Sequence, residues 1–240
     1  MESTRLKLPG AVFFISNIYS IFTGLVFTVI VTRSLTISEF GLWSMLSQYL
    51  AYTVIPLSNI VSFWTVRHVA RGFEQASKTG ILFGIILFSV GFPIYLLTAF
   101  LASLSFSQPL SILLLATPQV ATLIFLGALS AIATGLSPIH IGISNIVFET
   151  SKIVAAYSLV RVSKLGLVGA ILSVIFAQVI QIIYLIYVLR KTIIKSVIDF
   201  SLLKKWFKLS WLPVYELLSS VVGGLDVLVY GVDIYTYRFR

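Results

Sequence analysis

The chain is 240 residues long, and 58% of its residues are hydrophobic while only 10% are charged. A soluble domain of this size cannot cover that much apolar surface, so the composition excludes an ordinary water-soluble fold. The net charge of +9 would suggest nucleic acid as a partner of a soluble protein. In a membrane protein the same excess is typical of cytoplasmic loops, and we expect no nucleic-acid partner.

Seven apolar segments, separated by charged or turn-forming clusters, follow one another along the chain. A helix needs about 20 apolar residues to cross a bilayer, and lipid offers no partner for unpaired backbone groups. The segments therefore predict helical spans at 10–32, 41–64, 80–101, 111–134, 143–162, 167–189 and 210–232. The expected fold class is an all-α membrane protein, a polytopic bundle of about seven transmembrane helices.

The first two spans each carry a polar face. The first is expected to be a retained helix, because its apolar run is too long for a signal sequence. A single polar group in a membrane helix usually holds two helices together. Polar groups on several helices indicate a bundle with a hydrated interior. The residues are Asn17, Ser20, Gly24 and Thr28 on the first span and Ser44, Gln48, Tyr52 and Asn59 on the second.

Arg33 closes the first span on the expected outer side. One interpretation is that its side chain extends to the lipid headgroups. The other is that it adds positive potential to a cavity for an anionic, phosphate-bearing lipid, which the guanidinium fork suits.

Three prolines, Pro56, Pro93 and Pro118, lie inside predicted spans. Each removes one backbone N–H and frees a carbonyl. They predict that the second, third and fourth spans can bend.

The fifth span holds Asn145, Glu149 and Lys152 at positions that share one helix face. A glutamate and a lysine three residues apart can neutralise each other. Charge inside a membrane is costly, so two interpretations stay open. The residues form a charged stripe that lines a central cavity, or a self-satisfied pair near the cytoplasmic end of the helix.

A basic segment, 190–209, follows the sixth span. Between Ser196 and Lys208 it alternates apolar residues with lysines and includes Trp206. This pattern predicts an amphipathic helix on the inner membrane surface, attracted to anionic lipid. A solvated linker is the alternative.

The seventh span carries two acids, Glu216 and Asp226, on one stripe with small residues. It has no basic residue of its own, so these acids need a partner elsewhere. Lys152 and a terminal arginine are the candidates.

The distribution of basic residues predicts the orientation. With the N-terminus in the cytoplasm, eleven lysines and arginines lie in cytoplasmic segments and five in outer segments. This bias predicts a multi-pass protein of the cell membrane with a cytoplasmic N-terminus.

The domain organisation follows from the spans. We expect a six-helix transmembrane lobe at 1–189, a basic cytoplasmic linker with an amphipathic helix at 190–209, and a seventh helix with a short tail at 210–240. A transporter of two six-helix lobes begins in this way. The chain is therefore expected to be the N-terminal lobe of such a fold, with the second lobe missing.

The sequence carries no signature of an enzyme. It has no phosphate-binding glycine loop, no serine elbow and no metal-spaced cluster, and without cysteine it has neither disulfides nor thiolate metal sites. We expect no catalytic residue, no metal site and no cofactor.

Three segments carry a resemblance to a known family: Thr32–Gly41, Phe148–Lys191 with glycines at 166 and 169, and Phe207–Gly231 with its late aspartate. In this order they resemble the oligosaccharide-lipid flippases of the polysaccharide biosynthesis family, within the multidrug, oligosaccharidyl-lipid and polysaccharide exporter superfamily. The resemblance implies a two-lobed bundle that moves a polyprenyl-phosphate-linked glycan through a cationic cavity by alternating access. It also implies that Arg33 and Asp226 are motif residues, whereas the role of Glu149 and Lys152 is inferred from their positions.

The expected partners are membrane lipids, the glycan-bearing lipid, and a second lobe or a second copy that completes the transport path.

Three alternatives to the flippase function remain. A cation-coupled multidrug exporter of the same fold should carry acids in its first span, and Gly10–Thr32 has none. A retinal protein needs a lysine in its last helix, and Leu209–Val232 has none. A truncated remnant would not transport at all.

Overall fold

The computed structural model describes residues 3–210, with side chains described from Gly10 onward. Every regular element in this range is helical, which confirms the predicted all-α membrane fold. The elements are α1 (Ser3–Thr32), α2 (Ile37–Thr53), α3 (Ile55–Ala70), α4 (Ala76–Phe106), α5 (Leu110–Leu115), α6 (Thr117–Leu136), α7 (Pro138–Ala156), the π-helical turn η1 (Tyr157–Val162), α8 (Gly166–Lys195) and α9 (Phe200–Leu209).

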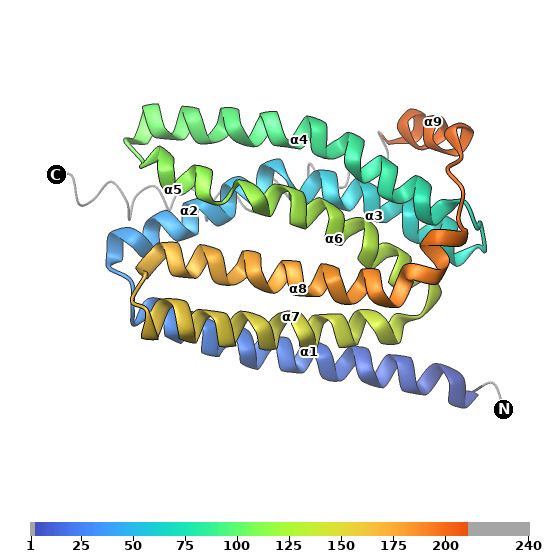
Figure 1. Cartoon of the computed structure of the whole chain (residues 1–240), viewed down its shortest axis with the longest axis horizontal. Helices are drawn as coiled ribbons and strands as arrows, with labels where there is room; N and C mark the ends of the chain where they lie inside the picture. The colour runs from blue at the N-terminus through green and yellow to red at the C-terminus, as the bar shows by residue number, and fades with distance from the viewer. Residues whose placement is uncertain (1–2, 211–240) are drawn as a thin grey trace.

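The long helices lie side by side along one axis and alternate in direction (Figure 1). Four segments of the described chain are long and apolar enough to cross a membrane: Gly10–Thr32, α4, Leu110–Leu136 and α8. The bent pair α2–α3 makes a fifth if it is one span. The predicted fifth span, 143–162, is helical as α7 and η1, but its polar side chains make it less apolar than these candidate membrane spans. The predicted span 210–232, with Glu216 and Asp226, lies outside the described residues.

Two of the three prolines coincide with breaks between helices. The chain bends by 42° between α2 and α3, and Pro56 is the second residue of α3. A second break separates α5 from α6, where Pro118 is again the second residue. Proline is tolerated in a first turn because its missing N–H would have no helical partner there. Pro93 instead lies inside α4, which continues through it.

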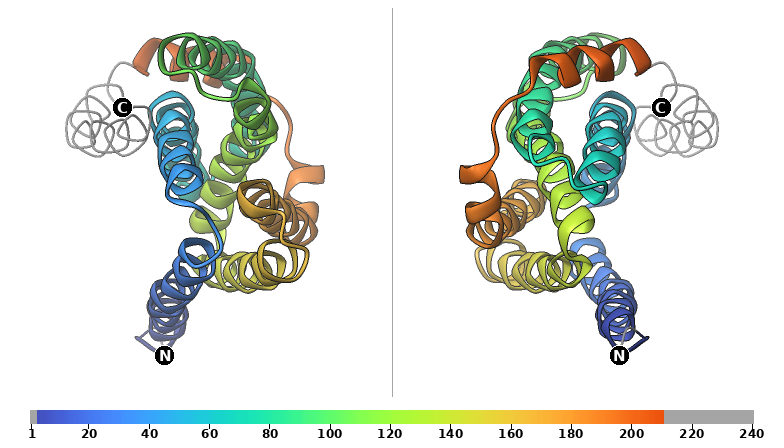
Figure 2. Two further views of the ribbon diagram at one scale, coloured as in Figure 1. Left: turned by 90° about the vertical axis from the view of Figure 1, so that its left-hand side faces the viewer. Right: turned by 90° about the vertical axis from the view of Figure 1, so that its right-hand side faces the viewer.

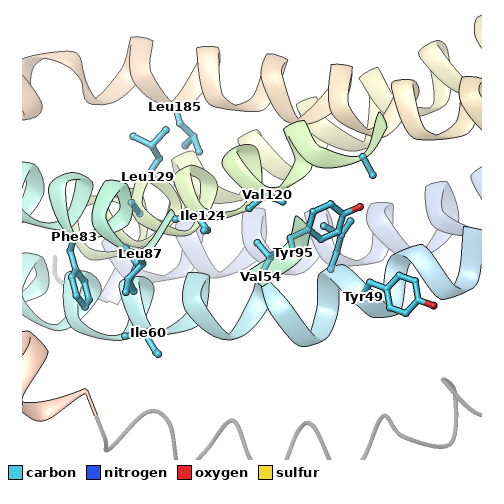
Figure 3. Close-up of a cluster of buried hydrophobic side chains, with 14 of the residues drawn as sticks. Tyr49, Val54, Ile60, Phe83, Leu87, Tyr95, Val120, Ile124, Leu129 and Leu185 are labelled. Atoms are coloured by element: carbon cyan, nitrogen blue, oxygen red, sulfur yellow. The ribbon is translucent and has the colours of Figure 1, made fainter. Parts of the chain in front are cut away.

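Helix α6 lies at the centre of the bundle. Seen from the ends, it stands between α2, α3 and α4 on one side and α1, α7 and α8 on the other (Figure 2). Its apolar face forms the main core with α3, α4 and α8, where Phe83, Ile124 and Leu185 are fully buried (Figure 3).

At one end of the bundle, two of the segments that carry the family resemblance meet. Thr36 and Glu39 form a capping box at the start of α2, in which each side chain bonds the other residue's backbone N–H. Gly166 opens α8 with φ at +55°, and a Cβ there would lie 2.9 Å from the Glu39 carboxylate. The close approach of Glu39 and Gly166 therefore explains why both residues are needed at this end of the bundle.

At the opposite end, the segment after α8 is tied to the start of α4. The Ser196 hydroxyl accepts a hydrogen bond from the Lys78 backbone N–H and donates one to the Glu74 carbonyl. The Asp199 N–H donates to the Thr79 hydroxyl. These bonds hold residues 196–199 against the first turn of α4.

Segment 200–209 forms the predicted amphipathic helix, α9, and the apolar face of this helix packs against protein. Trp206 is fully buried, with its ring 5.2 Å from that of His68 and 5.7 Å from that of Phe83. His68 of α3 and Phe83 of α4 therefore help to cover Trp206. The lysines of α9 (Lys204, Lys205 and Lys208) remain exposed.

Candidate functional site

An ion pair lies between α1 and α7, midway along the first span. Lys152 Nζ is 2.7 Å from Glu149 Oε2, and only 12% and 7% of the respective side chains are exposed. Ser20 is ten residues into the span, or about 15 Å along the helix axis, close to the middle of a hydrocarbon layer of about 30 Å. The sequence-predicted pairing of Glu149 with Lys152 is thus present.

Two hydroxyl groups of α1 complete the shell of the Glu149 carboxylate. Ser20 donates to Oε1 at 3.0 Å, and Thr23 lies 2.8 Å from Oε2. Hydrogen bonds to an ionised group are stronger than those between neutral groups. One lysine and two hydroxyls therefore satisfy a carboxylate that would otherwise be costly to bury.

The Lys152 ammonium also faces two aromatic rings. It lies 5.3 Å from the ring centroid of Phe27 and 4.9 Å from that of Phe148. Such cation–π contacts stabilise a cation that has lost part of its water. Lys152 is thereby held in place while a small part of its side chain stays accessible.

Amides extend the site from α7 to α8. Gln181 Nε2 donates to Asn145 Oδ1 at 3.3 Å and lies 3.4 Å from the Ser144 hydroxyl. We use the name "polar cluster" for Ser20, Thr23, Asn145, Glu149, Lys152 and Gln181. It joins three helices through groups that hydrocarbon cannot satisfy.

A glycine lets α1 and α7 approach closely enough for these bonds. A Cβ at Gly142 would lie 3.0 Å from Val12 Cγ1 and 3.2 Å from the Val12 carbonyl oxygen. Beyond the cluster, α7 passes into η1, and local π-helical geometry is frequent at functional sites.

A hollow of about 200 Å³ opens between α1 and α2, next to the polar cluster. Phe27 of the hollow links the two, because its ring faces Lys152 of the cluster and lies 6.0 Å from the ring of Trp43. Ser44 and Gln48 line the hollow, and neither side chain bonds to another described residue. We call this the α1–α2 hollow; it combines aromatic faces with hydroxyl and amide groups that have no partner among residues 10–210.

The structure brings together only some of the predicted site residues. Asn145, Glu149 and Lys152 belong to the cluster, whereas Arg33 is exposed just past the end of α1, about 15 Å along the helix from Thr23. Glu216 and Asp226 lie outside the described residues.

Sequence reasoning missed two members of the cluster, Thr23 and Gln181. Thr23 lies three residues after Ser20, so the polar face of the first span could have included it. Gln181 is an amide within a strongly apolar span, and such a group normally marks a helix contact.

No protein-family model and no curated protein matches the chain. Solved structures do share its fold. A crystal structure of a mutant MATE transporter is 14% identical, with a TM-score of 0.73 over 96% of this chain and 58% of that one. An outward-facing multidrug resistance MATE family transporter of the MOP superfamily is 14% identical, with a TM-score of 0.64 over 97% and 62%. A MOP superfamily transporter from Pyrococcus furiosus, described as having a binding pocket of reverse polarity, is 13% identical, with a TM-score of 0.63 over 97% and 62%.

The likeness shows the fold of the chain, a multi-pass bundle of membrane helices that these solved transporters share. The chain spans 58% to 62% of the length of these three structures.

Proposed function

We propose that this chain is the N-terminal lobe of a flippase that moves lipid-linked oligosaccharide precursors across the cell membrane by alternating access. The shared fold supports a transporter, and the segments around Glu39, Gly166 and Asp226 resemble the oligosaccharide-lipid flippases. A second lobe or a second copy of the chain completes the path.

The observation that carries the proposal is the fixed cation inside the candidate membrane span, between α1 and α7. Lys152 is held by Glu149 and by two aromatic rings, and it remains partly accessible. An ionisable group at this depth is by default a functional-site hypothesis, and transporter substrates bind near the midplane. The diphosphate of a polyprenyl-linked sugar is an anion that such a cation attracts.

The α1–α2 hollow suits the saccharide part of the same substrate. Trp43 offers an aromatic face, and Ser44 and Gln48 offer hydrogen-bonding groups that no described side chain or backbone group engages. A binding site of this kind orients its ligand through a few polar groups set among aromatic walls. We assign the phosphates to Lys152 and the first sugar to the hollow.

A second candidate is a cation-coupled multidrug exporter, and the Glu149 carboxylate favours it. With the hydroxyls of Ser20 and Thr23 it gathers the oxygen atoms that a small hard cation prefers. Lys152, however, already neutralises this carboxylate, so a coupling ion would have to displace the ammonium.

A transport assay separates the two functions. The chain is reconstituted in liposomes with a fluorescent polyprenyl-diphosphate sugar, and a membrane-impermeant quencher reports how much lipid has crossed. We expect movement without an imposed sodium or proton gradient, and at least a tenfold loss in Lys152→Met, about the effect of losing one charged hydrogen bond.

The matched control is Lys164→Met, which removes an exposed charge at the end of the bundle. Transport of a cationic dye that needs an ion gradient, with no movement of the glycan lipid, would establish the exporter instead. No movement of either substrate by a folded preparation would contradict a path completed by two copies of this chain.

A further inference from the structure

A second hollow, of about 220 Å³, lies at the end of the bundle that carries α9, away from the polar cluster. It is formed by the turn between α3 and α4, the first turn of α4 and the end of α8 (Figure 1). We call it the α4 hollow. At about 30 Å³ per molecule it has room for about seven waters, which suits a small polar headgroup rather than a drug-sized ligand.

One wall of the α4 hollow carries two hydrogen-bond donors that have no acceptor in the described part of the chain. Ser77 is the second residue of α4 and is only 1% exposed, yet neither its hydroxyl nor its backbone N–H bonds to another described residue. Its neighbour Lys78 is different, because its N–H is taken by Ser196. The start of a helix of 31 residues also carries the positive end of the helix dipole. These groups are suited to a phosphate.

Two side chains of opposite charge border the same hollow. Lys195 comes from the last turn of α8 and Glu74 from the turn before α4. They form no ion pair with each other, and neither side chain bonds to another described residue. A purely anionic ligand would satisfy Lys195 and Ser77 but would be repelled by Glu74. A zwitterion satisfies all three.

The rim of the α4 hollow is apolar and accessible. Phe73 and Leu136 line it and are 49% and 47% exposed. A soluble zwitterion gains nothing from such a rim, whereas the glycerol and upper acyl chains of a lipid do, at about 25 cal/mol for each Å² of apolar surface buried. The rim favours a membrane lipid as the source of the headgroup.

We infer that the α4 hollow binds the headgroup of a phosphoethanolamine lipid. Its phosphate lies at Ser77, the start of α4 and Lys195, and its primary ammonium lies at Glu74. A choline headgroup has no N–H to donate to this carboxylate, and a glycerol headgroup has no positive charge. The site therefore distinguishes phosphatidylethanolamine from both. This inference does not depend on the proposed transport function.

Native mass spectrometry of the detergent-solubilised full chain tests the inference. The chain is titrated with phosphatidylethanolamine, phosphatidylcholine and phosphatidylglycerol of identical acyl chains. We expect phosphatidylethanolamine to bind about tenfold more tightly than the other two, the effect of one hydrogen bond to a charged group.

Variants test which residues bind the phosphate and which bind the ammonium of the headgroup. Lys195→Gln and Ser77→Ala should weaken binding of all three lipids, by about tenfold for the lysine. Glu74→Gln should remove the preference for phosphatidylethanolamine and leave the other two lipids bound as well or better. The controls are Lys191→Gln, an exposed charge one turn earlier on α8, and Ser173→Ala, a buried serine whose hydroxyl bonds to its own helix.

Competition with soluble phosphoethanolamine shows whether the site binds a membrane lipid or the free headgroup compound. Displacement of the lipid only at a large excess of the soluble compound supports a lipid site, because the rim then contributes to affinity. Equal affinity for the three lipids in the unmodified chain would overturn the inference, as would a preference that survives Glu74→Gln. Binding of the soluble compound without binding of the lipid would also contradict it.

Discussion

Breaking the Glu149–Lys152 pair is the perturbation with the largest expected effect on stability. Removing one partner of a buried ion pair costs about 3–5 kcal/mol, because the other charge is left without compensation. In Lys152→Met the carboxylate keeps the hydroxyls of Ser20 and Thr23, so we expect the lower limit, about 3 kcal/mol.

Glu149→Gln leaves the ammonium beside the rings of Phe27 and Phe148, and we expect about 2 kcal/mol. The double variant removes both charges and should cost no more than about 2 kcal/mol, so the coupling energy is about 3 kcal/mol.

A double-mutant cycle measures this coupling. Reversible unfolding of the four proteins in mixed micelles, followed by tryptophan fluorescence, gives the free energy of unfolding of each. Additive effects, with a coupling below about 0.5 kcal/mol, would refute the geometry of the polar cluster.

Three further predictions concern the two ends of the bundle. Gly166→Ala should lower the free energy of unfolding by more than Gly72→Ala. Both glycines have positive φ, where a side chain costs about 1–2 kcal/mol, but only the Cβ at 166 would meet another side chain. Equal losses of stability would refute this contact. Trp206→Ala should lower the free energy of unfolding by about 3–5 kcal/mol and expose the segment before α9 to limited proteolysis. Phe207 is 44% exposed, so Phe207→Ala should lower the free energy of unfolding by less and leave that segment protected. The hydrogen bond from the Ser201 hydroxyl, with the Leu202 and Ser201 N–H groups, lowers the pKa of Asp199. The cap of α9 therefore adds stability above the ordinary aspartate pKa of about 3.9 that is lost as the pH falls through the lower, folded value. Tryptophan fluorescence should report this acid step, and its persistence in Asp199→Asn would contradict the assignment.

The sequence predicted the helical spans because each depends on a local property, the length of an apolar run. The apolar run 10–32 matches the end of α1, and the predicted spans at 80–101 and 167–189 lie inside α4 and α8. The pairing of Glu149 with Lys152 was equally local, since both residues lie on one face of one helix. Prolines marked the two breaks for the same reason.

What the sequence could not supply was which helices are neighbours. Thr23 and Gln181 belong to the polar cluster only because α1 and α8 flank α7, an arrangement that depends on packing between distant segments. The residues that cover α9 depend on packing in the same way. Its amphipathic pattern shows that Trp206 must be covered, but not whether lipid or the aromatic groups of α3 and α4 cover it.

The central claim is that a glycan-bearing polyprenyl diphosphate binds at Lys152 and the α1–α2 hollow. Because the chain has no cysteine, a single cysteine at Ser44→Cys can be labelled without other changes, with Ser105→Cys, exposed near the end of α4, as the control. We measure the rate at which a membrane-impermeant thiol reagent modifies each cysteine, with and without the lipid-linked sugar. We expect the sugar lipid to slow modification at position 44 severalfold and to leave position 105 unaffected. The protection at 44 should be lost when Lys152→Met is added. Modification at 44 that is unchanged by the sugar lipid, or slowed only by a cationic drug, would contradict it.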